Sequence, residues 1–319
     1  MSKAPAGLSN DPLWPRAGGW PHPDELPAGK RIDVALVGIP ASQTSLSDTN
    51  AHETPDAIRQ ALYRYSPALM QDRGSSEKGG PAATGIVDLE EIAVADFGNV
   101  SEPDSPAGEA RTIALMADAA KASELVIALG GDNSITVASA LGVWGSELET
   151  AGLITLDAHY DLRDGVSNGS PVRRLIEAGM NPARIVQIGI QDFANSVAYA
   201  RRAQELGITV IHRDELARRH IADVMADALS IAGAAGGPIH VDLDVDVCDR
   251  SVAPACPASV PGGISAYELR QAARAAGAHS QVRSIDLAEI DATMDAPDGR
   301  TVRLAALCVL DAVAGFSQR

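Results

Sequence analysis

The sequence predicts an α/β protein built on a parallel sheet with helices on both faces. Short apolar segments alternate with amphipathic helical patterns along nearly the whole chain, which is typical of β-α units and a parallel sheet. Apolar residues make up 45% of the 319 residues but aromatic ones only 3%. The predicted core therefore consists mainly of Ala, Val, Leu and Ile, which suits helices packed closely on a sheet.

The strands are predicted from apolar runs that show no polar alternation, as in strands buried on both sides. These runs occupy residues 33–39, 125–129, 153–157, 185–190, 208–212, 239–244 and 282–287. Helical periodicity covers residues 54–65, 107–122, 134–143, 171–179, 196–206, 219–233, 265–276 and 301–314. Start signals support several of these helices, such as Thr54 before Pro55, and Ser265 with Glu268 as a capping box.

No linker or repeat divides the chain, so a single domain over residues 32–319 is predicted. Residues 1–31 are rich in Pro and Gly and are expected to form an arm on the surface or on a neighbouring subunit. The polar segment from Met70 to Thr84 is expected to be a loop.

Composition also restricts location and partners. The formal net charge of −16 argues against nucleic acid or an anionic membrane as a partner. The N-terminal residues lack a basic start followed by an apolar run, so no signal peptide is expected, and no apolar run approaches the roughly 18 residues of a membrane span. Cys248, Cys256 and Cys308 have no C-x-x-C spacing and are interpreted as buried free thiols of a cytoplasmic protein.

Two acidic clusters predict a metal site. Asp157, His159 and Asp161 stand on alternate residues, so in an extended segment their side chains would point the same way. The segment 242–246 repeats this pattern with three aspartates. Carboxylates at the ends of apolar strands would repel one another unless a cation were present. A donor set of carboxylates with one imidazole and no thiolate favours Mn²⁺ over a Cys-rich zinc site.

A third element, G-G-D-N-S at 130–134, follows another predicted strand. Its glycines permit a sharp turn, and Asn133 opens the next helix. In parallel sheets, ligands bind beyond the carboxyl ends of the strands, where all three elements are expected to lie.

Together, G-G-D-N-S at 130–134, D-A-H-Y-D at 157–161 and D-V-D-V-C-D-R-S-V-A-P at 244–254, followed by P-G-G at 261–263, resemble the ureohydrolase or arginase superfamily. This superfamily includes arginase, agmatinase and formimidoylglutamase. The resemblance implies a three-layer α/β/α fold with about eight parallel strands. It also implies a binuclear manganese centre, hydrolysis of a C–N bond in a guanidino or formimino group, and assembly into trimers or hexamers.

The resemblance assigns the metal ligands residue by residue. Asp157 and Asp244 would bridge two Mn²⁺ ions, and His159 and Asp246 would complete the coordination of one of them. Asp161 would bind the other ion and lie near the hydroxide that attacks the substrate.

One position departs from the family pattern, because the family has a histidine ligand where this chain has Asn133. Asn133 is either a weaker metal ligand, leaving one ion loosely bound, or only a helix N-cap. Glu289 matches the glutamate that holds the planar cationic group of the substrate, with a surface carboxylate as the alternative. Asp242 matches no family ligand and is expected to support the ligands from behind.

The substrate is predicted from the residues after Asp161. Arg163 continues the alternating face, so its guanidinium would lie at the mouth of an acidic site and bind a substrate carboxylate. The alternative is an ion pair with Asp164 or with another surface acid. Asn168 and Ser170 lie where the family places substrate contacts, although a turn would use the same residues.

Arg173 and Arg174 are interpreted mainly as a solvated helix face. The segments D-A-H-Y-D-L-R, S-N-G-S-P-V-R-R-L-I-E and I-G-I-Q-D-F-A-N-S look most like formimidoylglutamase. This likeness implies hydrolysis of N-formimino-L-glutamate to L-glutamate and formamide, in histidine degradation. The alternatives are a guanidino-acid hydrolase that releases urea, and a catalytically weak member that binds a ligand.

Overall fold

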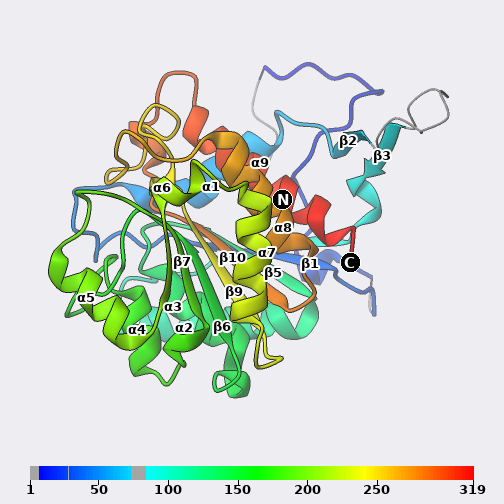
Figure 1. Cartoon of the computed structure of the whole chain (residues 1–319). Coiled ribbons are helices and arrows are strands. Elements are labelled where there is room, and N and C mark those ends of the chain that lie inside the picture. The colour runs from blue at the N-terminus through cyan, green and yellow to red at the C-terminus, as the bar shows by residue number, and fades with distance from the viewer. Residues whose placement is uncertain (1–6, 28, 73–83) are drawn as a thin grey trace, which may run out of the picture.

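The computed structural model describes residues 7–27, 29–72 and 84–319. Its centre is an eight-stranded parallel sheet with the strand order β4-β1-β5-β10-β9-β6-β7-β8 (Figure 1). The strands are β1 Val34–Ile39, β4 Val94–Asn99, β5 Leu125–Gly130, β6 Gly152–Leu156, β7 Ile185–Ile190, β8 Thr209–His212, β9 Ile239–Asp244 and β10 Val282–Ala288. The predicted α/β class with about eight parallel strands is confirmed.

Helices cover both faces of the sheet, which gives three layers (Figure 1). The helices are α1 Thr54–Leu62, α2 Pro106–Ala122, α3 Ile135–Trp144, α4 Pro171–Glu177, α5 Val197–Leu206, α6 Arg213–Leu216, α7 Ile221–Ala232, α8 Ala266–Ala278 and α9 Arg300–Phe316. Helices α2 to α5 pack over one face, and α1, α7, α8 and α9 pack over the other. The capping box predicted at Ser265 and Glu268 is present at the start of α8.

Burial explains why the strands show no polar alternation. Every residue of β1, β5, β7 and β9 is buried, because helices cover both sides of these strands. Strand β9 lies between β6 and β10, and its register places Asp242 opposite Asp286 and Asp244 opposite Ala288. The carboxyl ends of β5, β6, β9 and β10 therefore meet at one edge of the sheet.

The structure corrects two expectations about local structure. Strand β4 was not predicted, since its sequence V-A-D-F-G-N is half polar and it lies at the sheet edge. The loop expected from Met70 to Thr84 is wrong at both ends, because β2 (Ala68–Asp72) pairs antiparallel with β3 (Thr84–Asp88). Residues 73–83 lie outside the described residues.

The described part of the N-terminal arm contacts the body of its own chain. The Ala17 N–H donates to the Tyr65 carbonyl at 2.9 Å, and the Asp96 N–H donates to the Pro21 carbonyl at 2.9 Å. Ala17 is buried in the main hydrophobic core. The arm therefore adds to the core next to α1 and β4.

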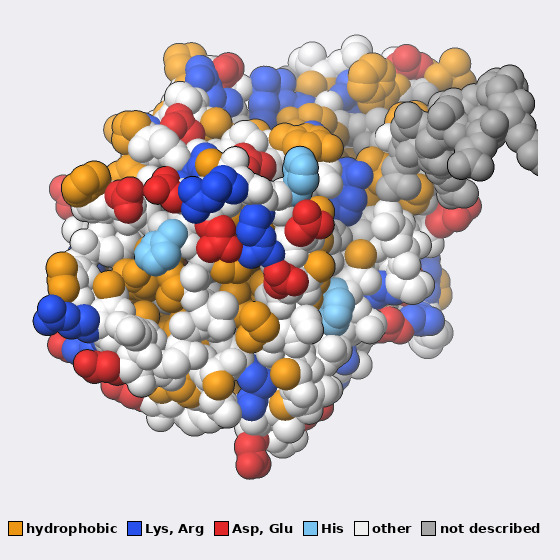
Figure 2. Space-filling model, viewed as in Figure 1, with side chains coloured by type: hydrophobic (Ala, Val, Ile, Leu, Met, Phe, Trp, Pro, Cys, Tyr) orange, Lys and Arg blue, Asp and Glu red, His pale blue; other side chains and the backbone are white. Residues whose placement is uncertain are grey.

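The surface carries both signs of charge despite the acidic composition. Figure 2 shows basic and acidic side chains side by side on the face that it presents. Among the described residues, no helix is long and apolar enough to cross a membrane.

Candidate metal centre

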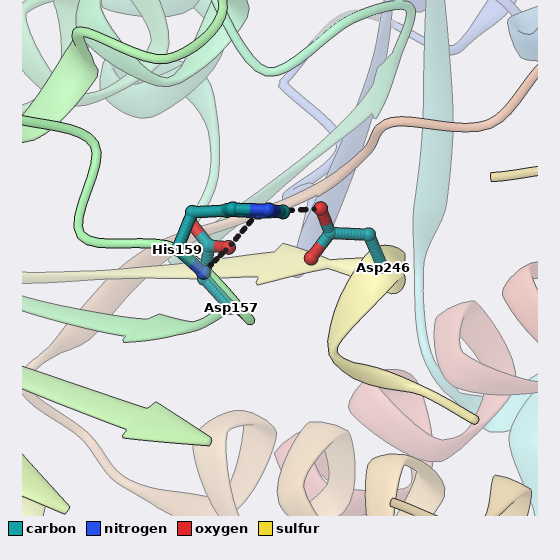
Figure 3. A group of neighbouring side chains, drawn as sticks. All are labelled: Asp157, His159 and Asp246. Atoms are coloured by element: carbon teal, nitrogen blue, oxygen red, sulfur yellow. Dashed lines mark hydrogen bonds and ion pairs between the residues drawn. The ribbon is translucent and has the colours of Figure 1, made fainter. Parts of the chain in front are cut away.

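Asp157, His159 and Asp246 meet at the carboxyl end of the sheet (Figure 3). The Nδ1 atom of His159 lies 2.9 Å from Oδ2 of Asp246 and 3.4 Å from Oδ1 of Asp157. One ligand atom from each residue lies within 4.8 Å of the other two. Within the described part of the chain, this is the group of His, Cys, Asp and Glu side chains whose arrangement could hold an ion.

The side chains converge because of turns, which corrects the expected extended geometry. Strand β6 ends at Leu156, and the His159 N–H turns back to donate to Oδ1 of Asp157 at 2.6 Å. Asp161 has a φ of 52°, a left-handed conformation that costs energy for a residue other than glycine. Asp246 lies in the single turn Val245–Val247 after β9, where its N–H donates to Asp244.

A cavity of about 240 Å³ opens over this centre. Its lining includes His159, Asp161, Asp244, Asp246 and Glu289. With Arg163 and Asn168, seven of the predicted site residues therefore line one cavity.

Glu289 follows β10 and has a φ of 62°. It accepts hydrogen bonds at Oε1 from the Asn133 N–H at 2.9 Å and from Nδ2 of Asn168 at 2.5 Å. Glu289 is only 4% exposed, so it is not a surface carboxylate. These contacts aim a buried acid at the cavity.

The alternative that Asn133 caps a helix is wrong. Helix α3 begins at Ile135, and the cap position is occupied by Ser134, which makes no side-chain cap bond. Asn133 instead reaches the acidic cluster, where its Nδ2 donates to Oδ2 of Asp161 at 2.7 Å. Its Oδ1 accepts from the Thr136 hydroxyl at 2.9 Å. In this orientation the amide donates to a carboxylate, and a ligand role for Asn133 stays a prediction.

Burial and mutual repulsion raise the pKa values of several acids in the cluster. Burial and the Asp246 charge raise the pKa of Asp157 to about 6. Burial and nearby carboxylates raise the pKa of Glu289 to about 8, and they also raise the pKa values of Asp161 and Asp244 well above 3.8.

His159 compensates part of this negative charge. Burial alone lowers its pKa, but Asp246 and Asp157 together raise it to about 12. Burial likewise raises the pKa of Asp246, but the contact with His159 brings it below its ordinary value. In the absence of a cation, Nδ1 of His159 thus pairs with the Asp157 and Asp246 carboxylates that converge on it.

These observations fit a divalent cation. Oδ2 of Asp157 is buried and has no hydrogen-bond partner among the residues that the structure describes, although buried polar atoms normally have one. The donors are carboxylate oxygens and one imidazole, the set that suits Mn²⁺. The buried Cys248 and Cys256 have pKa values raised by burial and line no part of the cavity.

Arg163 lies at the cavity wall with a free guanidinium. Its side chain rests against Gly169 and makes no hydrogen bond or ion pair with any described residue. The alternative pairing with Asp164 is wrong, because Asp164 binds Arg202 at 2.8 Å. Free basic groups at the mouth of an acidic cavity are suited to a substrate anion.

The neighbouring arginines are already engaged. Arg173 binds Glu177 and the carbonyls of Arg163 and Gly165, and Arg174 binds Glu109 at 2.8 Å. Their side chains are only 16% and 18% exposed, so the predicted solvated helix face is wrong: both arginines are paired and largely covered.

Asn168 and Ser170 have different surroundings. Asn168 lines the cavity, whereas the fully buried Ser170 hydroxyl donates to the Ser167 carbonyl at 2.8 Å and accepts from its N–H. Ser170 therefore serves the turn, and its substrate contact stays a prediction without structural support.

Asp242 lies on β9 two residues before Asp244 and opposite Asp286 of β10, and its expected role behind the ligands stays a prediction. His240 supports Asp286 through its Nε2 at 3.1 Å. The sequence does not reveal this pairing, because it is set by the strand register of β9 and β10.

Two residues at the centre were missed, Asn195 and Gln187. Asn195 binds the backbone of residues 158 and 160, and Nε2 of Gln187 donates to the Tyr160 carbonyl at 2.9 Å. The available signals were the place of Gln187 on a predicted strand and, for Asn195, the segment 188–196 that looks like formimidoylglutamase.

Comparison with known proteins supports the motif assignment. The profile described as the arginase family matches residues 32–315. The formimidoylglutamase of Halalkalibacterium halodurans is 32% identical over 297 residues, covering 90% of this chain and 88% of that protein. The formimidoylglutamase of Bacillus subtilis is 33% identical over 288 residues, covering 88% and 86%.

Solved structures show the same fold. The Bacillus subtilis formimidoylglutamase structure has a TM-score of 0.82 at 27% identity, covering 98% of this chain and 96% of that one. A Trypanosoma cruzi formiminoglutamase solved with Mn²⁺ has a TM-score of 0.77 at 22% identity, covering 90% and 94%. The predicted likeness to ureohydrolases, and to formimidoylglutamases most of all, is confirmed. The chain belongs to the arginase family and is a hydrolase of amidine C–N bonds.

Proposed function

We propose that this protein hydrolyses N-formimino-L-glutamate to L-glutamate and formamide. The observation that carries the proposal is the free guanidinium of Arg163 on the wall of a cavity that is otherwise acidic. N-formimino-L-glutamate carries two carboxylates and an amidine group, so it matches both features. The relatives at 32% and 33% identity are named formimidoylglutamases, which supports the same substrate.

We propose Asp157, His159, Asp161, Asp244 and Asp246 as the ligands of divalent cations, with two Mn²⁺ ions expected. When bound, such ions lower the pKa of water and supply a hydroxide at neutral pH. The clustered carboxylates would then be held in their charged forms, because cations replace the protons that burial favours.

The remaining residues would bind and orient the substrate. Glu289 would accept hydrogen bonds from the amidinium nitrogen, and it is oriented by the Asn133 N–H and by Asn168. Arg163 would bind a carboxylate at the far end through two parallel N–H groups. Asp161, held by Asn133, would lie beside the attacked carbon and take up a proton during the reaction.

A guanidino acid is the second candidate substrate, because a single carboxylate would also satisfy Arg163. A Pseudomonas aeruginosa relative named guanidinopropionase is 28% identical over 320 residues and covers 93% of each chain. The product would be urea in place of formamide. Agmatine is disfavoured, since it has an amine where Arg163 requires an anion.

The test is a substrate comparison with Mn²⁺-loaded protein. N-formimino-L-glutamate, arginine, agmatine and guanidinobutyrate are supplied in parallel, and formamide, urea and glutamate are measured. An Asp246→Ala variant, which lacks one predicted ligand, controls for contaminating activity. Formamide and glutamate from the first substrate alone support the proposal. Release of urea from a guanidino acid would change the assignment to a guanidino-acid hydrolase. No turnover of any of the four substrates would favour a ligand-binding role.

We also propose a cytoplasmic enzyme that assembles into trimers or hexamers, as its family resemblance implies. Mass photometry and metal analysis of the same sample would test the subunit number and the presence of two ions.

A further inference from the structure

The turn from Asp157 to Asp161 carries three proposed metal ligands but lies beyond the end of its strand. Because β6 stops at Leu156, only the start of this turn pairs with β7 and the residue after it, through Asp157 and Ala158. Its polar backbone groups must therefore find other partners. The hydrogen-bond partners of these backbone groups show which residues set the position of the ligands.

Several partners come from the main chain or from the acidic cluster itself. The Asp157 N–H donates to the Ile188 carbonyl at 3.0 Å, and the Asp161 carbonyl accepts from the Arg173 N–H at 3.2 Å. The Ala158 N–H donates to Oδ1 of Asp246 at 3.1 Å. These bonds fix the two ends of the turn and join it to the second acidic segment.

The middle of the turn is held by the Gln191 N–H, which donates to the Ala158 carbonyl at 3.1 Å, and by two neutral side chains, Gln187 and Asn195. Oδ1 of Asn195 accepts from the Tyr160 N–H at 3.1 Å, and its Nδ2 donates to the Ala158 carbonyl at 2.8 Å. These two groups flank His159 on either side. A primary amide can accept and donate at once, which a carboxylate or a hydrocarbon of the same size cannot do.

We propose that Asn195 is a positioning residue that holds the ligand turn in the shape required for metal binding. Its amide accepts from the Tyr160 N–H and adds a second bond to the Ala158 carbonyl, which the Gln191 N–H already contacts. It thereby fixes the direction of His159 and supports the left-handed backbone of Asp161. This inference rests on the proposed function, since it requires the turn to bind metal.

The placement of Asn195 explains why an amide in a loop would have this role. It lies just before α5, whereas its partners lie after β6, so it joins two segments that follow adjacent strands. It also contacts the Gln191 carbonyl at 3.3 Å, which orients the amide group. Nε2 of Gln187, on β7, donates to the Tyr160 carbonyl. Asn195 is thus held by Gln191 of its own loop and hydrogen-bonds to the loop that follows β6.

The test compares Asn195→Ala with Asn181→Ala. Asn181 is a matched control, because its side chain also accepts a backbone N–H, from Ala183 at 3.0 Å, but it lies at the turn before β7, away from the cavity. Mn²⁺ affinity is measured by isothermal titration calorimetry and by electron paramagnetic resonance. Melting temperature in EDTA, kcat and KM are measured on the same preparations.

We expect Asn195→Ala to weaken Mn²⁺ binding about 10- to 100-fold, as when a group that orients a metal ligand is lost. The melting temperature in EDTA should change no more than in Asn181→Ala. Substrate KM at saturating Mn²⁺ should stay close to that of the wild type. A raised KM with unchanged Mn²⁺ affinity would overturn the inference by making Asn195 a substrate contact, and a loss of stability alone would overturn it by making the role purely structural.

A second variant, Asn195→Asp, tests the positioning role without removing the side chain. Aspartate has nearly the same shape and adds a negative charge, which by Coulomb attraction alone would tighten cation binding. It cannot donate to the Ala158 carbonyl when ionised, so the positioning role predicts weaker binding. Tighter binding would overturn the proposal.

Failure of the proposed function would give a different experimental result from failure of this inference. A wild-type protein that binds no Mn²⁺ would refute the metal centre and this inference together. A wild type that binds Mn²⁺ and releases formamide, with Asn195→Ala binding it equally well, would refute this inference alone.

Discussion

Replacing Arg163 should weaken substrate binding with little effect on the chemical step. Its guanidinium has no partner among the described residues, so its loss breaks no internal bond. Charge-assisted hydrogen bonds contribute about 1.5–3 kcal/mol. Because Arg163 is exposed, the lower part of this range, about 1.5–2 kcal/mol, applies to Arg163→Ala. This corresponds to a rise in KM of about 10- to 30-fold.

Arg163→Lys should have a smaller effect, since lysine keeps the charge but loses the planar fork. Steady-state kinetics on N-formimino-L-glutamate give kcat and KM for both variants. Arg174→Ala is the control, because Arg174 is paired with Glu109. An unchanged KM for Arg163→Ala, or a loss confined to kcat, would refute the assignment of Arg163 as a carboxylate-binding residue.

The remaining predictions concern protonation, metal loading and stability. Metal-free protein should lose stability as the pH rises from 4.5 to about 8, because burial raises the pKa of Glu289 over that interval and the folded state keeps its proton. The increase in melting temperature on adding Mn²⁺ should grow over the same interval, since Mn²⁺ displaces protons, and a shift that is constant with pH would contradict this. Asn133→His should tighten binding of the weaker ion about tenfold, because imidazole is a better ligand than an amide bound to Thr136, and calorimetry showing equal affinities would exclude it. Ser265→Ala should lower the free energy of unfolding by about 1 kcal/mol in urea denaturation without changing kcat, since it removes the capping box of α8.

Much of the fold could be predicted because local patterns and tertiary burial agree. Strands such as β5 and β7 are apolar throughout and covered on both sides, so composition alone identifies them. Strand β4 could not be recognised, because an edge strand with Asp96, Gly98 and Asn99 resembles a loop. The pairing of β2 with β3 was hidden by polar residues that the sequence pattern assigns to a loop.

The ligand types at the site were evident in the sequence, but their geometry was not. Alternation at Asp157 and His159 indicated convergence, which the structure achieves through a turn and not through an extended strand. The partners of Asn133 depend on Asp161 and Thr136, and only the fold brings Asp161 close. The role of Asn195 could not be found, because it acts through backbone atoms of a segment more than 30 residues away. Contacts of this kind carry no sequence signature.

The most direct measurement is anomalous diffraction at the manganese edge from crystals grown with Mn²⁺ and L-glutamate, the expected product. The account predicts two peaks bridged by Asp157 and Asp244, one of them also contacted by His159 and Asp246 and the other by Asp161, with a glutamate carboxylate on Arg163. A single ion away from these side chains, or glutamate bound without contact to Arg163, would contradict it.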